Sequence, residues 1–221
     1  MNVTYPQGAK EVNCRFCALL GGAQDSFSSI WLEGDAFKAM VSVGSFIPGW
    51  TLICPVTHAV NLVDYYNLQD FWDFASHAAH VIKRRYGTCA MFEHGAAQET
   101  SLTGCGVGHA HGHLVPLNFS LEVEAREFAP ELTWRECRAE DVKVVAAGKE
   151  YLFAATSFNG SETRGILCLL ETPTSQFFRQ VIASKLGIGD LYDYKKYPML
   201  EMARASALEL QECKSDVVSK A

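Results

Sequence analysis

What the chain lacks already limits its function. None of its apolar runs approaches the roughly 18 to 20 residues that a membrane-spanning helix needs. Residues 1–13 contain no basic region followed by an apolar core, so we expect no signal peptide and a cytoplasmic location. Basic residues are scarce, with 19 Lys and Arg against 25 Asp and Glu, and this balance argues against a general nucleic-acid binder. We therefore expect neither a membrane nor a nucleic acid as a partner.

The cysteines lack the arrangement of a disulfide framework. Eight are scattered over a chain of 221 residues, which is long enough to bury a proper core. Cys54, Cys89 and Cys168 lie in apolar, strand-like runs, which favours buried free thiols. Cys14 and Cys17 form a C-x-x-C motif close to the start of the chain.

Hydrophobic periodicity predicts both strands and helices in the first half of the chain. Residues 37–43 and 50–54 are apolar and rich in β-formers around a Pro-Gly turn signal, which predicts an antiparallel pair. Residues 68–86 carry an apolar stripe at helical spacing. We expect Asn67 to cap this long helix and Gly87 to end it.

The second half predicts fewer elements. Residues 122–140 are charged and indicate a connector. A second strand pair is expected at 151–158 and 165–170. A helix is expected from Pro173 to about Leu186, and the last 20 or so residues indicate a further, polar helix.

The densest chemistry lies in residues 106–116, Gly-Val-Gly-His-Ala-His-Gly-His-Leu-Val-Pro. In a strand, alternate side chains share one face, so His109, His111 and His113 would stand in a row. Imidazole acts as nucleophile, proton carrier or metal ligand near neutral pH. Two interpretations stay open from the spacing: three ligands of one metal, or a central nucleophile with two helpers.

This segment resembles the signature of the histidine triad (HIT) superfamily, His-x-His-x-His followed by apolar residues. The resemblance covers about residues 10–120. Beyond the triad it rests on four further segments: Phe37 to His58, Cys14-Arg15-Phe16-Cys17, Phe92 to Gly95, and Gly104 to Val107. The C-x-x-C pair is similar to that of the zinc-carrying branch, and the last two segments resemble a bacterial subgroup.

The resemblance implies an α+β fold, with an antiparallel sheet of about five strands and a long helix, in a homodimer. We assign residues 1–122 to a HIT-like domain with its N-terminal C-x-x-C motif. Residues 123–221 then form an α/β C-terminal extension with a strand pair and helices.

The resemblance also implies a nucleotide hydrolase that acts at the α-phosphate. His111 would form a nucleotidyl-histidine intermediate, and His113 would hydrogen-bond the phosphate or assist proton transfer to the leaving group. One alternative is a nucleotidyl or phosphosugar transferase, although transferase branches often carry glutamine in place of the last histidine. Another is a zinc-stabilised nucleotide-binding module with little turnover.

The zinc ligands implied by the resemblance are Cys14, Cys17, His58 and His109, a closed structural set. That assignment leaves His111 and the last histidine of the row for the substrate. The alternative is a pair of free thiols, with His58 as a hydrogen-bonding neighbour of the triad.

The chain departs from the family at several places, one of which is Gly112 where the family has a larger apolar residue, and two of which concern substrate contacts. Ser42 stands near the position of the acidic residue that binds ribose, which puts an ordinary nucleoside in doubt. Cys105-Gly106 replaces a Gln-Ser pair that contacts phosphate. The backbone N–H groups of Gly106 and Val107 would replace those side-chain donors.

Two further residues are candidate substrate contacts. His94 is either a contact or a structural residue. Arg179 follows a helix start, where anions are favoured, and would reach a phosphate of its own or of a partner subunit. The alternative for Arg179 is an ordinary solvated helix start.

Overall fold

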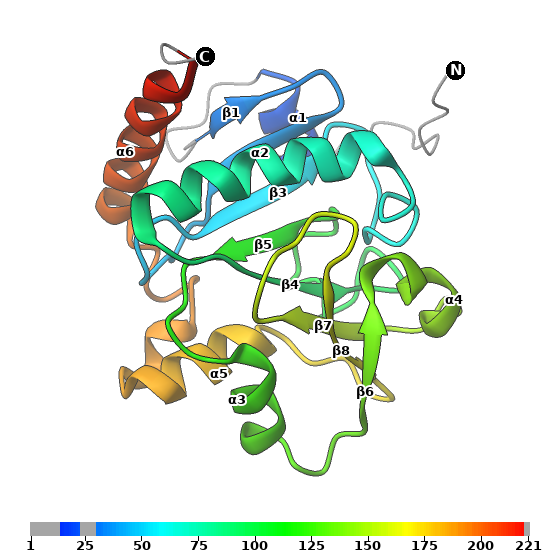
Figure 1. The fold of residues 1–221 in the computed structure, drawn as a ribbon. Coiled ribbons are helices and arrows are strands. Elements are labelled where there is room, and N and C mark those ends of the chain that lie inside the picture. The colour runs from blue at the N-terminus through cyan, green and yellow to red at the C-terminus, as the bar shows by residue number, and fades with distance from the viewer. Residues whose placement is uncertain (1–13, 23–29, 219–221) are drawn as a thin grey trace.

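The fold is organised around one antiparallel sheet. The computed structural model describes residues 14–22 and 30–218 (Figure 1). Within these residues the sheet has eight strands in the order β1-β2-β3-β5-β4-β7-β8-β6. Its strands are β1 (Ile30–Glu33), β2 (Phe37–Val41), β3 (Thr51–Pro55), β4 (Ala90–Gly95), β5 (Gly112–Val115), β6 (Trp134–Arg138), β7 (Tyr151–Ala155) and β8 (Arg164–Leu169).

Helices cover both faces of the sheet. They are α1 (Arg15–Leu20), α2 (Gln69–Tyr86), α3 (Leu121–Phe128), α4 (Val142–Ala146), α5 (Phe177–Leu186) and α6 (Leu200–Val218). Apolar residues of α2, α4 and α6 join one core cluster, those of α3 and α5 a second on the other face, and those of α1 a third against β2 and β3. Figure 1 shows α2 and α6 on one side, and α3 and α5 on the other. None of the helices in the described part of the chain is long and apolar enough to cross a membrane.

The predicted α+β class with an antiparallel sheet is confirmed, but the sheet is larger than expected. The five strands β1-β2-β3-β5-β4 would make the predicted sheet alone. Strand β4 then pairs with β7, from Met91 opposite Ala155 to Gly95 opposite Tyr151. The C-terminal extension therefore continues the same sheet, and β4 has a partner on each edge.

Most of the predicted pairs and helices are present. Strands β2 and β3 form the expected antiparallel pair around the Pro-Gly turn, and β7 and β8 form the second. Helix α2 ends at Gly87 as predicted, with φ of 87°. Helix α6 accounts for the helix expected at the end of the chain.

Three local predictions were wrong. Leu68, not Asn67, is the N-cap of α2, and no side chain caps that helix. The segment expected as a charged connector, 122–140, contains most of α3 and all of β6. Ser120 caps α3 by accepting a bond from the Val123 N–H, and Leu121 and Ala125 of this helix are buried. The helix expected from Pro173 starts only at α5, after a left-handed Gln176. The expectation about a signal peptide concerns residues 1–13, which lie outside the described residues.

Candidate active site and metal cluster

The spacing predicted that the three histidines lie in one strand, and this prediction is wrong. Strand β5 begins at Gly112, so of the three only His113 belongs to it. Gly106 and Gly108 adopt left-handed conformations, with φ of 70° and 61°, and turn the chain before the strand. This irregular approach separates the environment of His109 from that of His111.

Side chains still alternate from Ala110 onward. Ala110 and Leu114 are buried in the cluster under α2, whereas His111 and His113 line a pocket on the other face. A Cβ at Gly112 would lie 3.0 Å from the Leu62 side chain, so a larger residue here requires that side chain to shift by a few tenths of an ångström.

Four side chains converge at one edge of the pocket into what we call the metal cluster. Their ligand atoms all lie within 4.8 Å of one another, and they belong to Cys14, Cys17, His58 and His109. The His58 Nδ1 lies 3.2 Å from the Cys17 Sγ, and the His109 Nδ1 lies 3.4 Å from the Cys14 Sγ. Donors around a tetrahedral zinc are about 3.5 Å apart, as follows from its bond lengths. The cluster could hold a metal ion.

The outer nitrogen of each cluster histidine is already engaged. The His109 Nε2 donates to the Pro55 carbonyl at 2.9 Å, and the His58 Nε2 lies 3.1 Å from the Glu99 carboxylate. Such bonds leave the Nδ1 lone pairs facing the sulfurs, as metal-binding histidines require. Burial lowers the pKa of His109 to about 4, which keeps its imidazole neutral. The residues therefore fit a metal ion in both donor type and orientation.

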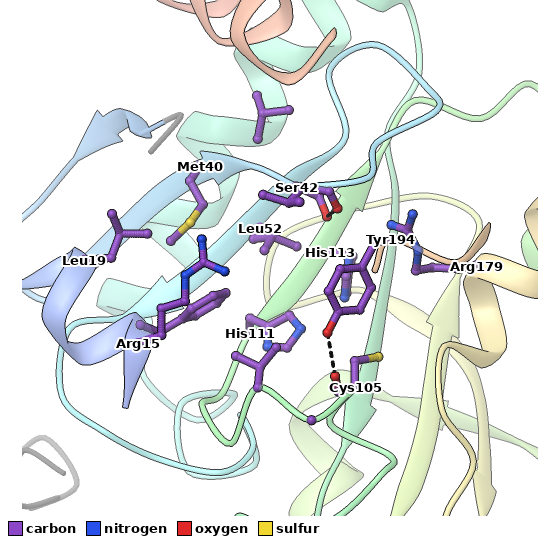
Figure 2. Close-up of a pocket in the computed structure, with 15 residues that line it drawn as sticks. Arg15, Leu19, Met40, Ser42, Leu52, Cys105, His111, His113, Arg179 and Tyr194 are labelled. Carbon is purple, nitrogen blue, oxygen red and sulfur yellow. Dashed lines mark hydrogen bonds between the residues drawn. The ribbon is translucent and has the colours of Figure 1, made fainter. Parts of the chain in front are cut away.

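The pocket beside this cluster has a volume of about 290 Å³ (Figure 2). Helix α1, strands β2 and β3, the loop before β5, α5 and the segment after α5 all contribute to it. Its lining residues are Arg15, Phe16, Leu19, Met40, Val41, Ser42, Val43, Leu52, Cys105, Gly106, Val107, His111, His113, Arg179 and Tyr194. Apart from Arg15, the side chains from α1, β2 and β3 are apolar, and the remaining polar groups gather around the two histidines.

His111 is held as a neutral imidazole with one nitrogen available. Its Nδ1 donates to the His109 carbonyl at 2.8 Å, which leaves the lone pair on Nε2. Burial lowers the pKa of His111, although that carbonyl favours the charged form. No described residue hydrogen-bonds to Nε2, so this atom is free to act on a ligand in the pocket.

His113 has the opposite tautomer. The Trp50 indole N–H donates to its Nδ1 at 2.9 Å, so the proton of the neutral ring sits on Nε2. Burial holds the pKa of His113 well below its usual value. The Nε2 is itself buried and has no hydrogen-bond partner among the described residues. An unpaired buried donor at a pocket wall indicates a ligand acceptor.

His94 does not line the pocket. Its Nε2 accepts from the Phe178 backbone N–H at 3.1 Å, and its Nδ1 lies 3.9 Å from the Cys105 Sγ. Burial lowers the pKa of His94 to about 3. The structure thus places it between α5 and the loop before β5, with both nitrogens directed at protein atoms.

The other predicted contacts do meet at the pocket. Ser42, Gly106, Val107 and Arg179 all line it. The Val107 N–H, however, already donates to the Gly104 carbonyl at 3.1 Å. Gly106 therefore offers the backbone donor of this loop.

Sequence reasoning missed two residues of the site. Trp50 sets the tautomer of the last histidine, and Tyr194 closes the pocket by donating its hydroxyl to the Cys105 carbonyl at 2.8 Å (Figure 2). Trp50 lies beside the Pro-Gly turn, where an aromatic residue is an ordinary core residue. No local pattern marks Tyr194.

Comparison with known proteins gives matches in structure only. No family model matches the chain, and no curated protein matches its sequence. A HIT-like protein involved in cell-cycle regulation from Bartonella henselae is 22% identical, with 49% of this chain and 79% of that one covered and a TM-score of 0.41. A hypothetical histidine triad nucleotide-binding protein from Sulfolobus tokodaii is 19% identical, with 47% and 68% covered and a TM-score of 0.39. A HIT family hydrolase from Clostridium thermocellum is 22% identical, with 48% and 92% covered and a TM-score of 0.40.

Over about half of its length, this chain is therefore similar to these three solved structures, each of them under 25% identical and with a TM-score below 0.5.

Proposed function

We propose that the protein is a HIT-type nucleotide hydrolase that acts at the α-phosphate through His111. The observation that carries this proposal is the state of the His111 ring. Its Nδ1 proton is fixed on a carbonyl at 2.8 Å, and its Nε2 lone pair is free at the pocket. A neutral, oriented imidazole is what nucleophilic attack on phosphorus needs.

The reaction takes two displacements. In the first, the His111 Nε2 forms a bond to the α-phosphorus, and the bond from phosphorus to the leaving group breaks. The leaving group departs with the bonding pair and takes a proton from water. In the second, water attacks phosphorus and gives a proton to the hydroxide left by the first step, the bond to Nε2 breaks and a nucleoside monophosphate is released. The His109 carbonyl stabilises the positive charge that the ring carries between the two steps.

His113 acts as a hydrogen-bond donor in this proposal. The sequence left open whether it binds phosphate or passes a proton to the leaving group. Because Trp50 occupies its Nδ1 lone pair, loss of the Nε2 proton would leave an imidazolate. The ring therefore supports donation of a hydrogen bond to a phosphate oxygen, together with the Gly106 N–H.

The apolar end of the pocket suits a base. Phe16, Leu19, Met40 and Leu52 line it from α1, β2 and β3. A planar apolar ring placed there would direct its phosphate toward the histidines. Ser42 offers a hydroxyl to the sugar, although its hydrogen bond to the Val43 carbonyl at 3.2 Å occupies its proton.

We assign zinc to the metal cluster as a structural ion. Cys14, Cys17, His58 and His109 supply four ligands and leave no open position, which is typical of a structural site. The ion would fix α1 against the segment before β5. In this way the cluster holds the His109 carbonyl in place for the nucleophile.

The test is turnover. The metal-loaded protein is incubated with adenosine phosphoramidate and with dinucleoside polyphosphates, in parallel with the His111→Ala variant. We expect nucleoside monophosphate from the wild type and a loss of more than about a thousandfold in the variant, since the nucleophile is gone. Equal turnover in both would overturn the assignment. Ligand binding without turnover in the wild type would favour the binding module.

A transferase is separated from a hydrolase by product analysis. His113 in the last triad position supports water as the acceptor. If the wild type releases monophosphate only when a second acceptor is present, the transferase is correct. The homodimer implied by the resemblance stays a prediction. Among the described residues the sheet ends at β1 and β6, and side chains of α6 donate to the Ile30 and Trp31 carbonyls of β1.

A further inference from the structure

Arg179 is a buried cation that no described residue neutralises. The residue is 2% exposed and lines the same pocket as His111. Its Nε donates to the Tyr192 carbonyl at 2.6 Å, and its Nη2 donates to the Gly44 carbonyl. None of the ion pairs among the described residues involves it.

The charge is retained despite burial. Burial lowers the pKa of Arg179 to about 10, so the guanidinium is still protonated at neutral pH. Three nearby groups favour the charged form, and the weakest of them is the Asp193 carboxylate. This carboxylate already accepts a hydrogen bond from the Lys195 backbone N–H at 3.0 Å. A buried charge without a partner is costly, and proteins keep one where a ligand supplies the opposite charge.

The guanidinium is also held in a fixed place. It lies over the rings of Trp50 at 4.8 Å, Phe46 at 5.3 Å and Tyr194 at 5.8 Å. Three aromatic contacts and two carbonyl bonds restrict its movement, so the remaining N–H groups present a pre-organised donor. Figure 2 shows Arg179 near Tyr194, at the opposite end of the pocket from Leu19 and Arg15.

Two side chains, Trp50 and His113, connect Arg179 to the proposed nucleophile His111. The Arg179 guanidinium packs on the face of the Trp50 ring, and the Trp50 N–H donates to His113. His111 lies beyond His113, with ring centroids 5.0 Å apart, and contacts Phe16 at 5.7 Å. The cation therefore lies past the last histidine, away from the ring that would attack phosphorus.

The pocket wall near this cation is unsuited to a neutral diol. Among the described residues that line the pocket, none is aspartate or glutamate. Ser42 stands two residues from the Gly44 carbonyl that binds Arg179. A carboxylate would accept hydrogen bonds from sugar hydroxyls, whereas arginine selects phosphate or carboxylate groups.

We propose that the substrate carries a second acidic group, a phosphate or carboxylate held by Arg179, in addition to the phosphate that His111 attacks. This inference rests on the proposed function for the identity of the attacked group. The second group belongs either to the sugar or to the leaving group, and the guanidinium would bind both in the same way. Its role is to determine specificity.

Calorimetric titration at fixed ionic strength tests this on the metal-loaded protein. The reference ligand is a nucleoside 5′-monophosphate, run with each of the four common bases. The sugar arm uses the 2′,5′- and 3′,5′-bisphosphates, and the leaving-group arm uses the 5′-diphosphate. We expect the ligand of one arm, either a bisphosphate or the 5′-diphosphate, to bind the wild type at least about tenfold more tightly than the monophosphate does.

The variants isolate Arg179. R179Q should bring the affinity ratio between that ligand and the monophosphate to about one, and R179K should give an intermediate ratio because it lacks the planar fork. K185Q removes the same charge from an exposed position on α5, where Lys185 pairs with Glu124, and should keep the ratio. If R179Q does not fold, which circular dichroism reports, R179K decides.

Two outcomes would overturn the inference. One is a ratio near one in both arms for the wild type. The other is an equal loss for both ligands in R179Q, which would place Arg179 on the attacked phosphate instead. Failure of the proposed function is seen separately, because absence of turnover leaves the binding ratio measurable.

Discussion

The metal cluster and the pocket use histidines from the same short segment in opposite ways. In the cluster, His109 donates from Nε2 to a carbonyl and turns its Nδ1 lone pair to the thiols. Two residues later, His111 donates from Nδ1 and leaves Nε2 for the pocket. His113 accepts from an indole and presents an N–H.

The comparison shows that the role of each histidine depends on the partner of its other nitrogen. In the proposed function, one partner suits the ring to a metal, the next to nucleophilic attack and the third to donation of a hydrogen bond. All three rings are neutral because burial lowers their pKa values. The following predictions, in order of decreasing effect, test this division.

Removal of a cluster ligand should abolish metal binding. Cys17→Ala should reduce the zinc content, measured by elemental analysis, from about one per chain to near zero. The melting temperature should fall by about 10 °C or more, since metal binding contributes to folding. Cys168→Ala, a buried thiol on β8 outside the cluster, should keep its zinc. Unchanged zinc in the Cys17 variant would refute the ligand set.

Removal of the indole N–H should disturb the pocket only. Trp50→Phe leaves the His113 Nδ1 without its donor, so either nitrogen of that ring can carry the proton. We expect kcat/KM to fall about tenfold to a hundredfold, with zinc retained. Nitrogen NMR of the ring should show mixed tautomers. Trp134→Phe is the control, because the Trp134 N–H has no partner among the described residues. An unmixed tautomer in the Trp50 variant would contradict the assignment.

The loop before β5 should be sensitive to a side chain. Gly106→Ala forces an L-residue into φ of 70°, which costs about 1 kcal/mol or more, so the loop should shift. We expect KM to rise about tenfold, because the Gly106 N–H leaves its place. Gly148→Ala has a similar φ of 80° with no neighbour within 4 Å, and should lower stability without changing KM. Equal KM in the two variants would remove Gly106 from the site.

Acid should destabilise the fold through His94. Its folded pKa of about 3 lies below the unfolded value of 6.5, so the unfolded state binds the proton more tightly. The contribution of neutral His94 to the free energy of unfolding is complete above pH 6.5. It is lost as pH falls from 6.5 toward 3, by roughly 1.4 kcal/mol for each pH unit. Denaturant titrations at several pH values from 7 to 5 give the free energy of unfolding at each pH. Its decrease with falling pH should be smaller in His94→Asn than in the wild type. His80 is exposed, so His80→Asn should show the same pH dependence of unfolding free energy as the wild type. The same pH dependence in His94→Asn as in the wild type would disprove the effect.

Local signals predicted the local elements well. The Pro-Gly turn gave the β2–β3 pair, and Gly87 ended α2, because backbone sterics decide both. Short-range reasoning failed at Asn67 and along 122–140, where tertiary packing of α3 outweighed the charged sequence. The division of the chain at residue 122 stays a prediction, although one sheet runs across it.

The sequence by itself determined which chemistry is present: three imidazoles at two-residue spacing and a thiol pair. Only the tertiary structure decided how that chemistry is divided. Trp50 is 63 residues from the histidine that it orients, and Arg179 is 135 residues from the Gly44 carbonyl that holds it. Tautomers and unpaired buried charges depend on such distant partners, because hydrogen bonds and burial form only when the sheet assembles. A motif therefore names the reacting groups, and the fold assigns their roles.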